Sequence, residues 1–138
     1  MLTPVMQSTL KPTALVVAAN AAEYEQIMYC LQPFYLTVKA TSINEATRQL
    51  QQMRPAVVVL DPDLPDGDGM EWLRYLRSNS ATLDLIISCV THRSTVRDKV
   101  TGFIAGADDY VIYPLNRETF GYRLTLLTRM GRHSAWKR

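Results

Sequence analysis

Four aspartates follow one short apolar run of the sequence. The run is Ala56–Leu60 (AVVVL), and Asp61, Asp63, Asp66 and Asp68 lie in the polar segment directly after it. A carboxylate at the end of a buried strand can bind a metal ion or act as a nucleophile, and aspartate can accept a phosphoryl group as an aspartyl phosphate. We therefore expect Asp61 to carry the chemistry of this segment, with Asp63 as a second carboxylate. Asp66 or Asp68 is expected to cap the next helix.

The residues give little support to other kinds of catalytic or metal site. His92 and His133 are the two histidines and form no nucleophile–base pair, and Cys30 and Cys89 have neither CxxC spacing nor a histidine cluster nearby. The segment Ala18–Ala21 contains no glycine, which argues against a glycine-rich phosphate loop. We predict a protein that is not an enzyme, holds no structural zinc and works in the reducing cytoplasm.

Short apolar runs that alternate with helical periods must position these residues. Two of the helical segments begin with the spacing of a capping box, Asn20 with Glu23 and Ser42 with Glu45. The alternation predicts an α/β fold, a doubly wound five-stranded parallel sheet with five helices on its two faces. The predicted strands are Leu15–Val17, Tyr35–Ala40, Ala56–Leu60, Leu85–Val90 and Tyr110–Ile112.

Each predicted helix has a stripe of apolar residues at helical spacing, and we expect the stripe to face the sheet. The fourth helix is expected to stop at Gly106, and Asn116 is expected to cap the last one. The stripes are Tyr24, Ile27, Met28 and Leu31; Ile43, Ala46, Leu50 and Met53; Met70, Leu73 and Leu76; Val96, Val100 and Phe103; and Phe120, Leu124 and Leu127.

The carboxyl ends of the predicted strands define the candidate site. In doubly wound sheets these ends share one edge, and ligands bind in the crevice beyond it. The residues expected at this edge are Ala18, Ala19, Asn20, Asp61, Asp63, Thr91, Tyr113 and Pro114.

From these motifs, residues 13–130 resemble the response-regulator receiver domain of two-component signalling, a flavodoxin-like (βα)5 fold. Asp61 with Leu64-Pro65 and Asp68-Gly69 is similar to the segment around the family's phospho-acceptor. The resemblance implies that Thr91 is the hydroxyl that senses the phosphoryl group. The run Gly106–Tyr110 (GADDY) is similar to a turn of the family, and Tyr110 matches the aromatic side chain that turns inward on activation.

Two departures from the receiver pattern lie at the phosphorylation site. The family has an acidic pair for Mg²⁺ after the first strand, where this chain has Ala18 and Ala19. It has a lysine where this chain has Tyr113, followed by Pro114. Phosphoryl transfer to a carboxylate brings two anions together, and a metal ion and a lysine normally neutralise that charge.

We therefore expect an atypical receiver that uses no cofactor and acts without conventional Mg²⁺-dependent phosphorylation. The alternative is a conventional switch in which a histidine kinase phosphorylates Asp61, with Mg²⁺ at an improvised site of Asp63 and Asn20. The alternative predicts measurable Mg²⁺ affinity, and the first hypothesis predicts none.

The resemblance also implies an output surface on the fourth helix, fifth strand and fifth helix. We expect a homodimer through this surface, in which mixed charges on the facing helices pair across a two-fold axis. The regulated effector, attached or a partner protein, is expected to be transcriptional. The surface residues considered are Arg97, Asp98, Tyr113, Arg117, Glu118 and Arg123.

Length and composition fit one globular domain. The chain has 138 residues, 47% hydrophobic and 20% charged. We expect a leader over residues 1–12, the receiver domain over 13–130, and a basic tail over 131–138 that either starts a linker to an effector domain or is a frayed end. The tail carries no element for specific nucleic-acid readout. No apolar run approaches the ~18 residues that would span a membrane.

Overall fold

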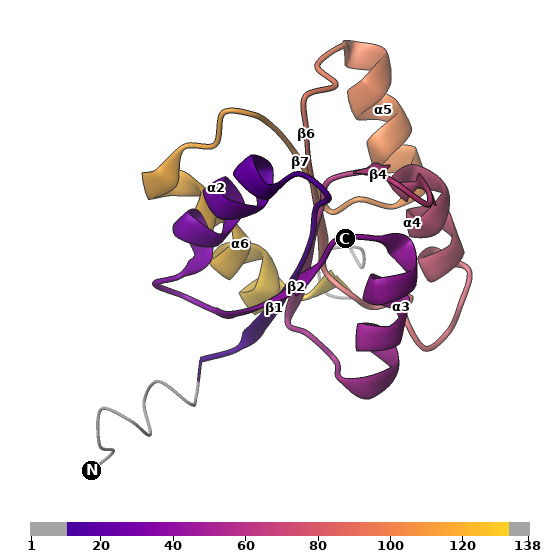
Figure 1. Ribbon diagram of the computed structural model, residues 1–138, viewed down its shortest axis with the longest axis horizontal. Helices are drawn as coiled ribbons and strands as arrows, with labels where there is room; N and C mark the ends of the chain where they lie inside the picture. Colours follow the sequence, from indigo (N-terminus) through magenta and orange to yellow (C-terminus); the bar gives the residue numbers. More distant parts are fainter. Residues whose placement is uncertain (1–10, 133–138) are drawn as a thin grey trace.

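The structure is a computed structural model that describes residues 11–132, in which strands and helices alternate along the chain (Figure 1). The elements are β1 (Thr13–Val17), α2 (Ala21–Leu31), β2 (Leu36–Ala40), α3 (Ile43–Gln52), β3 (Val57–Leu60), β4 (Asp63–Leu64), β5 (Gly67–Asp68), α4 (Gly69–Arg77), β6 (Ile87–Thr91), α5 (Val96–Ala105), β7 (Asp109–Ile112) and α6 (Arg117–Met130).

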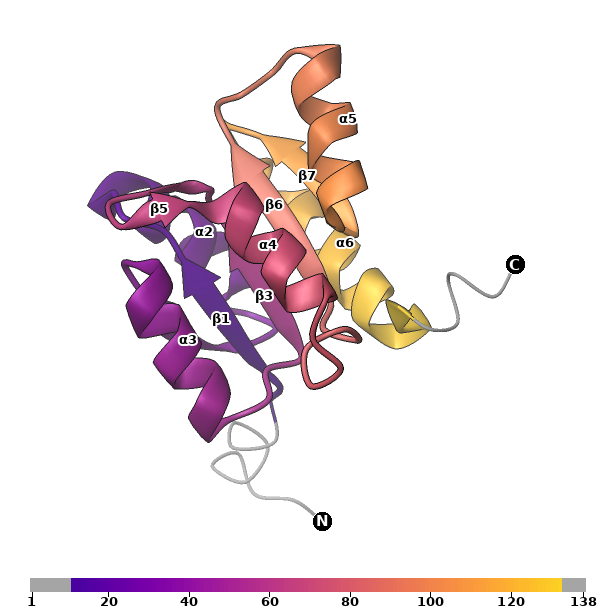
Figure 2. The same cartoon turned by 90° about the vertical axis from the view of Figure 1, so that its right-hand side faces the viewer.

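Five strands form one parallel sheet in the order β2-β1-β3-β6-β7. Helices α2 and α6 cover one face, and α3, α4 and α5 cover the other (Figures 1 and 2). The predicted doubly wound sheet with five helices is confirmed. Val17 pairs with Leu60 in the β1–β3 register, so the residues after these two strands, Ala18 and Asp61, lie next to each other at the carboxyl edge.

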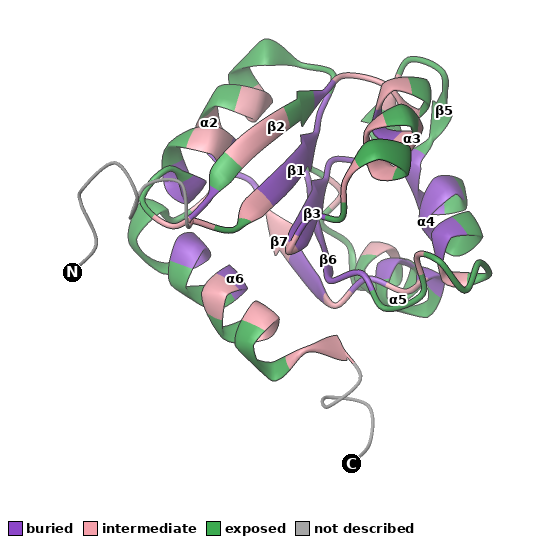
Figure 3. Cartoon of the chain, turned by 90° about the horizontal axis from the view of Figure 1, so that it is seen from below, coloured by how far each residue is buried: buried purple, intermediate pink, exposed green. Residues whose placement is uncertain are grey.

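The central strands are buried on both sides, as Figure 3 shows for β1, β3 and β6. Their side chains alternate between two apolar clusters, one under α3, α4 and α5 and one under α2 and α6. Branched apolar residues suit such positions because helices cover both faces of a parallel sheet. Each of the five strands in this sheet begins and ends within two residues of its predicted bounds.

Polar side chains begin the helices, although the capping differs from the prediction. Asn20 Oδ1 accepts from the backbone N–H groups of Ala22 and Glu23, and Ser42 Oγ accepts from that of Glu45. The glutamates do not complete these capping boxes among the described residues, because Glu45 bonds to Thr41 and Glu23 turns toward a histidine. Asn20 and Ser42 therefore cap their helices as predicted, but Glu23 and Glu45 do not accept from the backbone N–H of the cap residue, which a capping box requires.

The acidic loop after β3 folds into a small antiparallel hairpin, β4 with β5. Asp68 caps α4 through the Met70 N–H, in agreement with the prediction. Asp66 instead accepts from the N–H groups of Ile43 and Asn44 at the start of α3. It thus joins this hairpin to a different helix from the one expected.

The apolar stripe predicted to bury α5 is largely exposed, which corrects that prediction. Val96, Val100 and Phe103 are 78%, 49% and 48% exposed, and α5 instead buries Gly102 and Ala105 against its neighbours. The small residues let the helix lie close to β7, and the large apolar side chains are left on the surface.

No helix within residues 11–132 combines the length and apolar character needed to cross a membrane. Most of the predicted leader and residues 133–138 of the predicted tail lie outside the described part of the chain.

Candidate functional site

Asp61 lies at the carboxyl edge of the sheet, as predicted, and is 6% exposed. Its N–H bonds to the carbonyl of Val17, which fixes the residue against β1. Its Oδ1 accepts from the N–H of Asp63 at 3.1 Å, and its Oδ2 accepts from the phenol of Tyr113 at 2.9 Å. Burial raises the pKa of Asp61, and these two hydrogen bonds offset part of that rise.

Tyr113 directly follows β7 and is buried. Its backbone N–H bonds to the Thr91 carbonyl, which ties the backbone of Tyr113 to the end of β6. Burial, and secondly the Asp61 carboxylate, raise the pKa of the phenol, so Tyr113 is a neutral donor to Asp61. The peptide bond to Pro114 is cis, and Pro114 itself is exposed.

The residues after β1 supply no carboxylate to this site. Ala18 is buried and Ala19 is exposed. The amide oxygen of Asn20 serves as the N-cap of α2, with two N–H donors at 2.8 and 3.3 Å. The observed role of Asn20 is therefore that of a cap.

Asp63 is paired with a cation from the chain itself. Arg93 Nη2 lies 2.6 Å from Asp63 Oδ1 and 3.7 Å from Asp68 Oδ1. These side chains and Ala19 line an open hollow of about 670 Å³ next to Asp61.

This arrangement does not fit a Mg²⁺ ion. Mg²⁺ is usually held by carboxylates, but Ala18 and Ala19 carry none and Asp63 is bound to Arg93. Within residues 11–132, no group of three or more histidine, cysteine, aspartate or glutamate side chains could hold a metal ion.

Thr91 and Tyr110 are both engaged with the loop after β6. Thr91 is fully buried, and its Oγ1 accepts from the Arg93 N–H at 3.1 Å. Tyr110 is 6% exposed, and its phenol donates to the Arg93 carbonyl at 2.7 Å. The ring lies against Gly102 of α5, and burial raises the pKa of Tyr110 to about 12.

His92 extends the polar contacts around Tyr113. Its Nε2 lies 2.7 Å from Glu23 Oε1, and its ring lies beside the Tyr113 ring with centroids 4.5 Å apart. Glu23 also disfavours the ionised form of Asp61, because it brings a second negative charge near that carboxyl. Glu23 and His92 thus connect α2 to the Asp61 site.

Sequence reasoning missed the part of Arg93 and Glu23 in this site. Arg93 stands two residues after the strand-end hydroxyl of Thr91, and Glu23 lies in the first turn of the helix after Ala19. Their sequence positions close to predicted strand ends could have indicated that both residues lie near Asp61. The carboxylate that pairs with Arg93 could not be predicted, because it depends on how the β4–β5 hairpin folds.

Two of the charged residues predicted on the output surface bond within the chain. Arg123 makes two bonds to the carboxylate of Asp109, at 2.6 and 2.8 Å. Asp98 completes a capping box with Thr95 at the start of α5, which the sequence analysis did not identify.

The remaining charged residues of that surface are exposed. The Arg117 guanidinium lies 3.8 Å from the centre of the Tyr29 ring, which places it on the side of α6 that faces α2. Arg97 and Glu118 are exposed on α5 and α6.

Comparisons with known proteins agree on one family. Residues 9–124 match the response regulator receiver domain. The chain is 31% identical over 116 residues to the phosphate regulon transcriptional regulatory protein PhoB of Escherichia coli K12, a match that covers 83% of this chain and 51% of PhoB. It is 36% identical over 95 residues to the transcriptional regulatory protein BasR of the same organism, covering 69% and 42%.

The solved structures show the same architecture. A candidate response regulator from Chloroflexus aurantiacus J-10-fl superimposes with a TM-score of 0.81 at 28% identity, covering 86% of this chain and 98% of that one. This chain spans about half the length of the curated relatives that it matches.

Proposed function

This chain belongs to the response regulator receiver family, and we propose that it is an atypical receiver, a signalling and dimerisation module that works without Mg²⁺-dependent phosphorylation of Asp61. The hydrogen bond from Tyr113 to Asp61 Oδ2, inside a buried pair, is the observation that supports this most directly. It occupies one oxygen of the phospho-acceptor with a neutral donor.

The charges around Asp61 support the proposal. A phosphoryl group is an anion, so a lysine ammonium would stabilise it by its charge as well as by a hydrogen bond, whereas the Tyr113 phenol donates a hydrogen bond without a charge. Ala18 and Ala19 supply no carboxylate that could hold a metal ion between Asp61 and the phosphoryl group. The carboxylate of Glu23 adds to the repulsion.

A second set of contacts supports an active conformation that is stabilised without a phosphoryl group. The receiver resemblance associates activation with an inward aromatic at Tyr110, and here that ring is inward and bonded to the Arg93 carbonyl. Thr91 accepts from the Arg93 N–H, and the Arg93 guanidinium is held by Asp63. Phosphorylation ordinarily supplies the bias between two receiver forms, and these bonds would supply it from within the chain.

The association surface is proposed to lie on α5, β7 and α6, at one edge of the sheet (Figure 2). Because Asp98 and Arg123 are engaged within the chain, exposed apolar side chains are the more suitable contacts. A two-fold contact would pair this surface with itself. The exposed apolar residues of the two helices include Val96, Val100, Phe103, Ile104, Leu126 and Met130.

The regulated effector is proposed to be transcriptional, either a further domain or a separate protein. PhoB and BasR are transcriptional regulatory proteins and about twice as long as the matched region or more. Residues 11–132 are proposed to act through protein contacts in the cytoplasm, with no enzyme activity and no specific nucleic-acid readout of their own.

Sedimentation velocity across a concentration series tests this proposal with three variants. Phe103→Asp should weaken self-association by about tenfold or more, because it places a charge in an apolar contact. Leu36→Asp is the matched control, since Leu36 is 46% exposed on the opposite edge strand β2. Asp61→Ala should associate like the wild type. Loss of association in Asp61→Ala, or equal behaviour of Phe103→Asp and Leu36→Asp, would contradict the proposal.

The second candidate is a conventional switch phosphorylated on Asp61 by a histidine kinase. It is favoured by the exposed carboxylates of Asp63 and Asp68, which line the hollow next to Asp61. It requires Asp63 to leave Arg93. It predicts saturable Mg²⁺ binding by isothermal titration calorimetry, and the first candidate predicts none.

A further inference from the structure

Helix α2 contacts two neighbouring loops at the carboxyl edge of the sheet. Glu23 and Gln26 are three residues apart in its first two turns, so their side chains lie on the same side of the helix. Glu23 Oε1 lies 2.7 Å from Nε2 of His92, in the loop after β6. Gln26 Oε1 accepts from the N–H of Leu115, in the loop after β7, at 2.6 Å. One side of α2 thus fixes the loop that carries Tyr113 and the loop next to it.

The two contacts act on the ring and on the backbone of Tyr113. The His92 ring lies against the Tyr113 ring, with the centroids 4.5 Å apart and the planes tilted by 36°. Leu115 is two residues after Tyr113, so its bond to Gln26 restrains the backbone that carries the phenol. Glu23 acts on Tyr113 through His92. We call Glu23, His92 and Gln26 the α2 bracket.

The bond from Tyr113 to Asp61 requires that the ring is held in one place and one orientation. The Tyr113 Oη–Asp61 Oδ2 distance is 2.9 Å, and a displacement to about 3.6 Å would abolish the hydrogen bond. The ring also belongs to the apolar cluster under α2 and α6, with Ile27 and Phe120. Apolar packing is non-directional, whereas the hydrogen bonds of the α2 bracket fix an orientation.

We propose that the α2 bracket positions the phenol of Tyr113 on Asp61. This inference rests on the proposed function, in which Tyr113 occupies one oxygen of the phospho-acceptor. It adds that this occupancy depends on α2, so that a movement of α2 away from the two loops would release Asp61. The His92 side chain is 63% exposed, so a binding partner can reach the bracket from solvent.

The ¹³C resonance of the Asp61 carboxyl carbon in the full-length chain reports on this bond without a phosphorylation assay. Tyr113→Phe removes the hydroxyl and keeps the ring, so the shift that it causes in this resonance measures the bond. We expect a clear shift in the wild-type background and a shift about threefold smaller, or less, in a Glu23→Ala/Gln26→Ala background. Each single alanine variant should give an intermediate shift. Glu23→Gln, which keeps an oxygen acceptor for His92, should retain the full shift.

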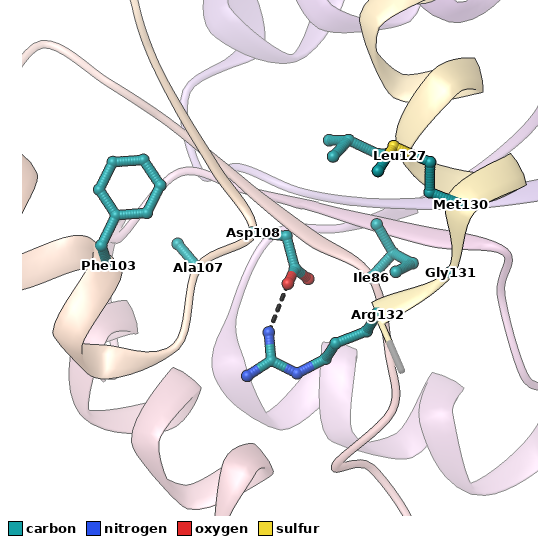
Figure 4. A pocket seen from close by; sticks show the side chains of 8 residues that line it. All are labelled: Ile86, Phe103, Ala107, Asp108, Leu127, Met130, Gly131 and Arg132. Carbon is teal, nitrogen blue, oxygen red and sulfur yellow. Dashed lines mark hydrogen bonds and ion pairs between the residues drawn. The ribbon is translucent and has the colours of Figure 1, made fainter. Parts of the chain in front are cut away.

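Two control variants separate the α2 bracket from the general effect of losing a side chain. Glu25→Ala removes an exposed carboxylate from α2. Met130→Ala removes a side chain that lines a cavity of about 310 Å³ between α5 and α6 (Figure 4). That cavity lies at the amino edge of the sheet, because its residues Ile86 and Ala107 precede β6 and β7. Both variants should leave the shift caused by Tyr113→Phe as in the wild type.

Equal shifts in all backgrounds would overturn the proposal, because apolar packing alone would then hold the ring of Tyr113. The absence of any shift in the wild-type background would also overturn it, since the bond to Asp61 would not be formed. Failure of the proposed function gives a different result, which is a phosphoryl group on Asp61 of the wild-type chain. Shifts that still differ between the backgrounds would then support the positioning role of α2 on its own.

Discussion

Replacing Gly102 with alanine tests whether close packing against α5 holds Tyr110 in its inward position. A Cβ built on Gly102 would lie 2.7 Å from Cδ2 and 2.8 Å from Cε2 of the Tyr110 ring. Such distances are far below van der Waals contact, so either the ring or the helix must move. If the ring moves outward, the bond from its phenol to the Arg93 carbonyl is lost.

The expected change in stability follows from three opposing effects. Alanine is about 1 kcal/mol better than glycine in a helix interior. Overpacking costs about 1–3 kcal/mol, and the lost hydrogen bond costs about 1 kcal/mol. Gly102→Ala should therefore lower the free energy of unfolding by about 1–3 kcal/mol.

The same substitution should have the opposite sign once the ring is absent. In a Tyr110→Ala background nothing in the ring's place opposes the new methyl group, so Gly102→Ala should raise the free energy of unfolding by up to ~1 kcal/mol. Urea unfolding of the four proteins in this double-mutant cycle measures both effects. Equal destabilisation in the two backgrounds would refute the claim that Gly102 is required by the inward Tyr110.

Two further substitutions test the charge of Asp61 and the buried ion pairs that Asp108 makes with Arg77 and Arg132. Burial raises the pKa of Asp61 above its unfolded value, so its ionisation opposes folding; this cost is absent below about pH 4 and is fully present above the raised pKa. Asp61→Asn should therefore be more stable than the wild type at pH 7, with an advantage that shrinks as the pH falls toward 4 in urea unfolding; an advantage that grows on acidification would contradict this. Asp108→Ala should lower the free energy of unfolding by about 3–5 kcal/mol, because it leaves the buried Arg77 without its carboxylate, whereas Arg74→Ala should change it by about 0.5 kcal/mol or less. A similar loss of unfolding free energy in the two variants would show that the ion pairs of Asp108 contribute no more to stability than an exposed ion pair.

The sheet could be predicted from the sequence because its strands are marked by local composition. Runs such as Ala56–Leu60 are apolar on both faces, and polar residues such as Asn20 and Ser42 mark the helix starts that follow. Such local signals determine which segments form elements, and the parallel topology then follows from their alternation. The position of Asp61 at the sheet edge was predictable for the same reason.

The surface of α5 could not be predicted from periodicity alone. Val96, Val100 and Phe103 have helical spacing, but the helix approaches β7 through Gly102, where the Tyr110 ring occupies the space of a side chain. Periodicity identifies an apolar stripe without showing whether the stripe faces the sheet or a partner.

The pairing of charges in the Asp61 site also depends on tertiary structure. Arg93 and Asp63 are 30 residues apart in the sequence and meet only because β6 and the β4–β5 hairpin lie at the same edge. Asp66 reaches the start of α3 for a similar reason. Sequence reasoning could propose these residues as site or cap residues, but their partners are set by loops whose fold has no local signature.

The measurement that tests the central claim most directly is the intact mass of the chain after incubation with Mg²⁺ and acetyl phosphate, with Asp61→Asn as the control. We predict no added phosphoryl group on either protein under conditions that label a conventional receiver. A gain of one phosphoryl group on the wild type, absent from Asp61→Asn, would contradict the account and establish Asp61 as a working phospho-acceptor.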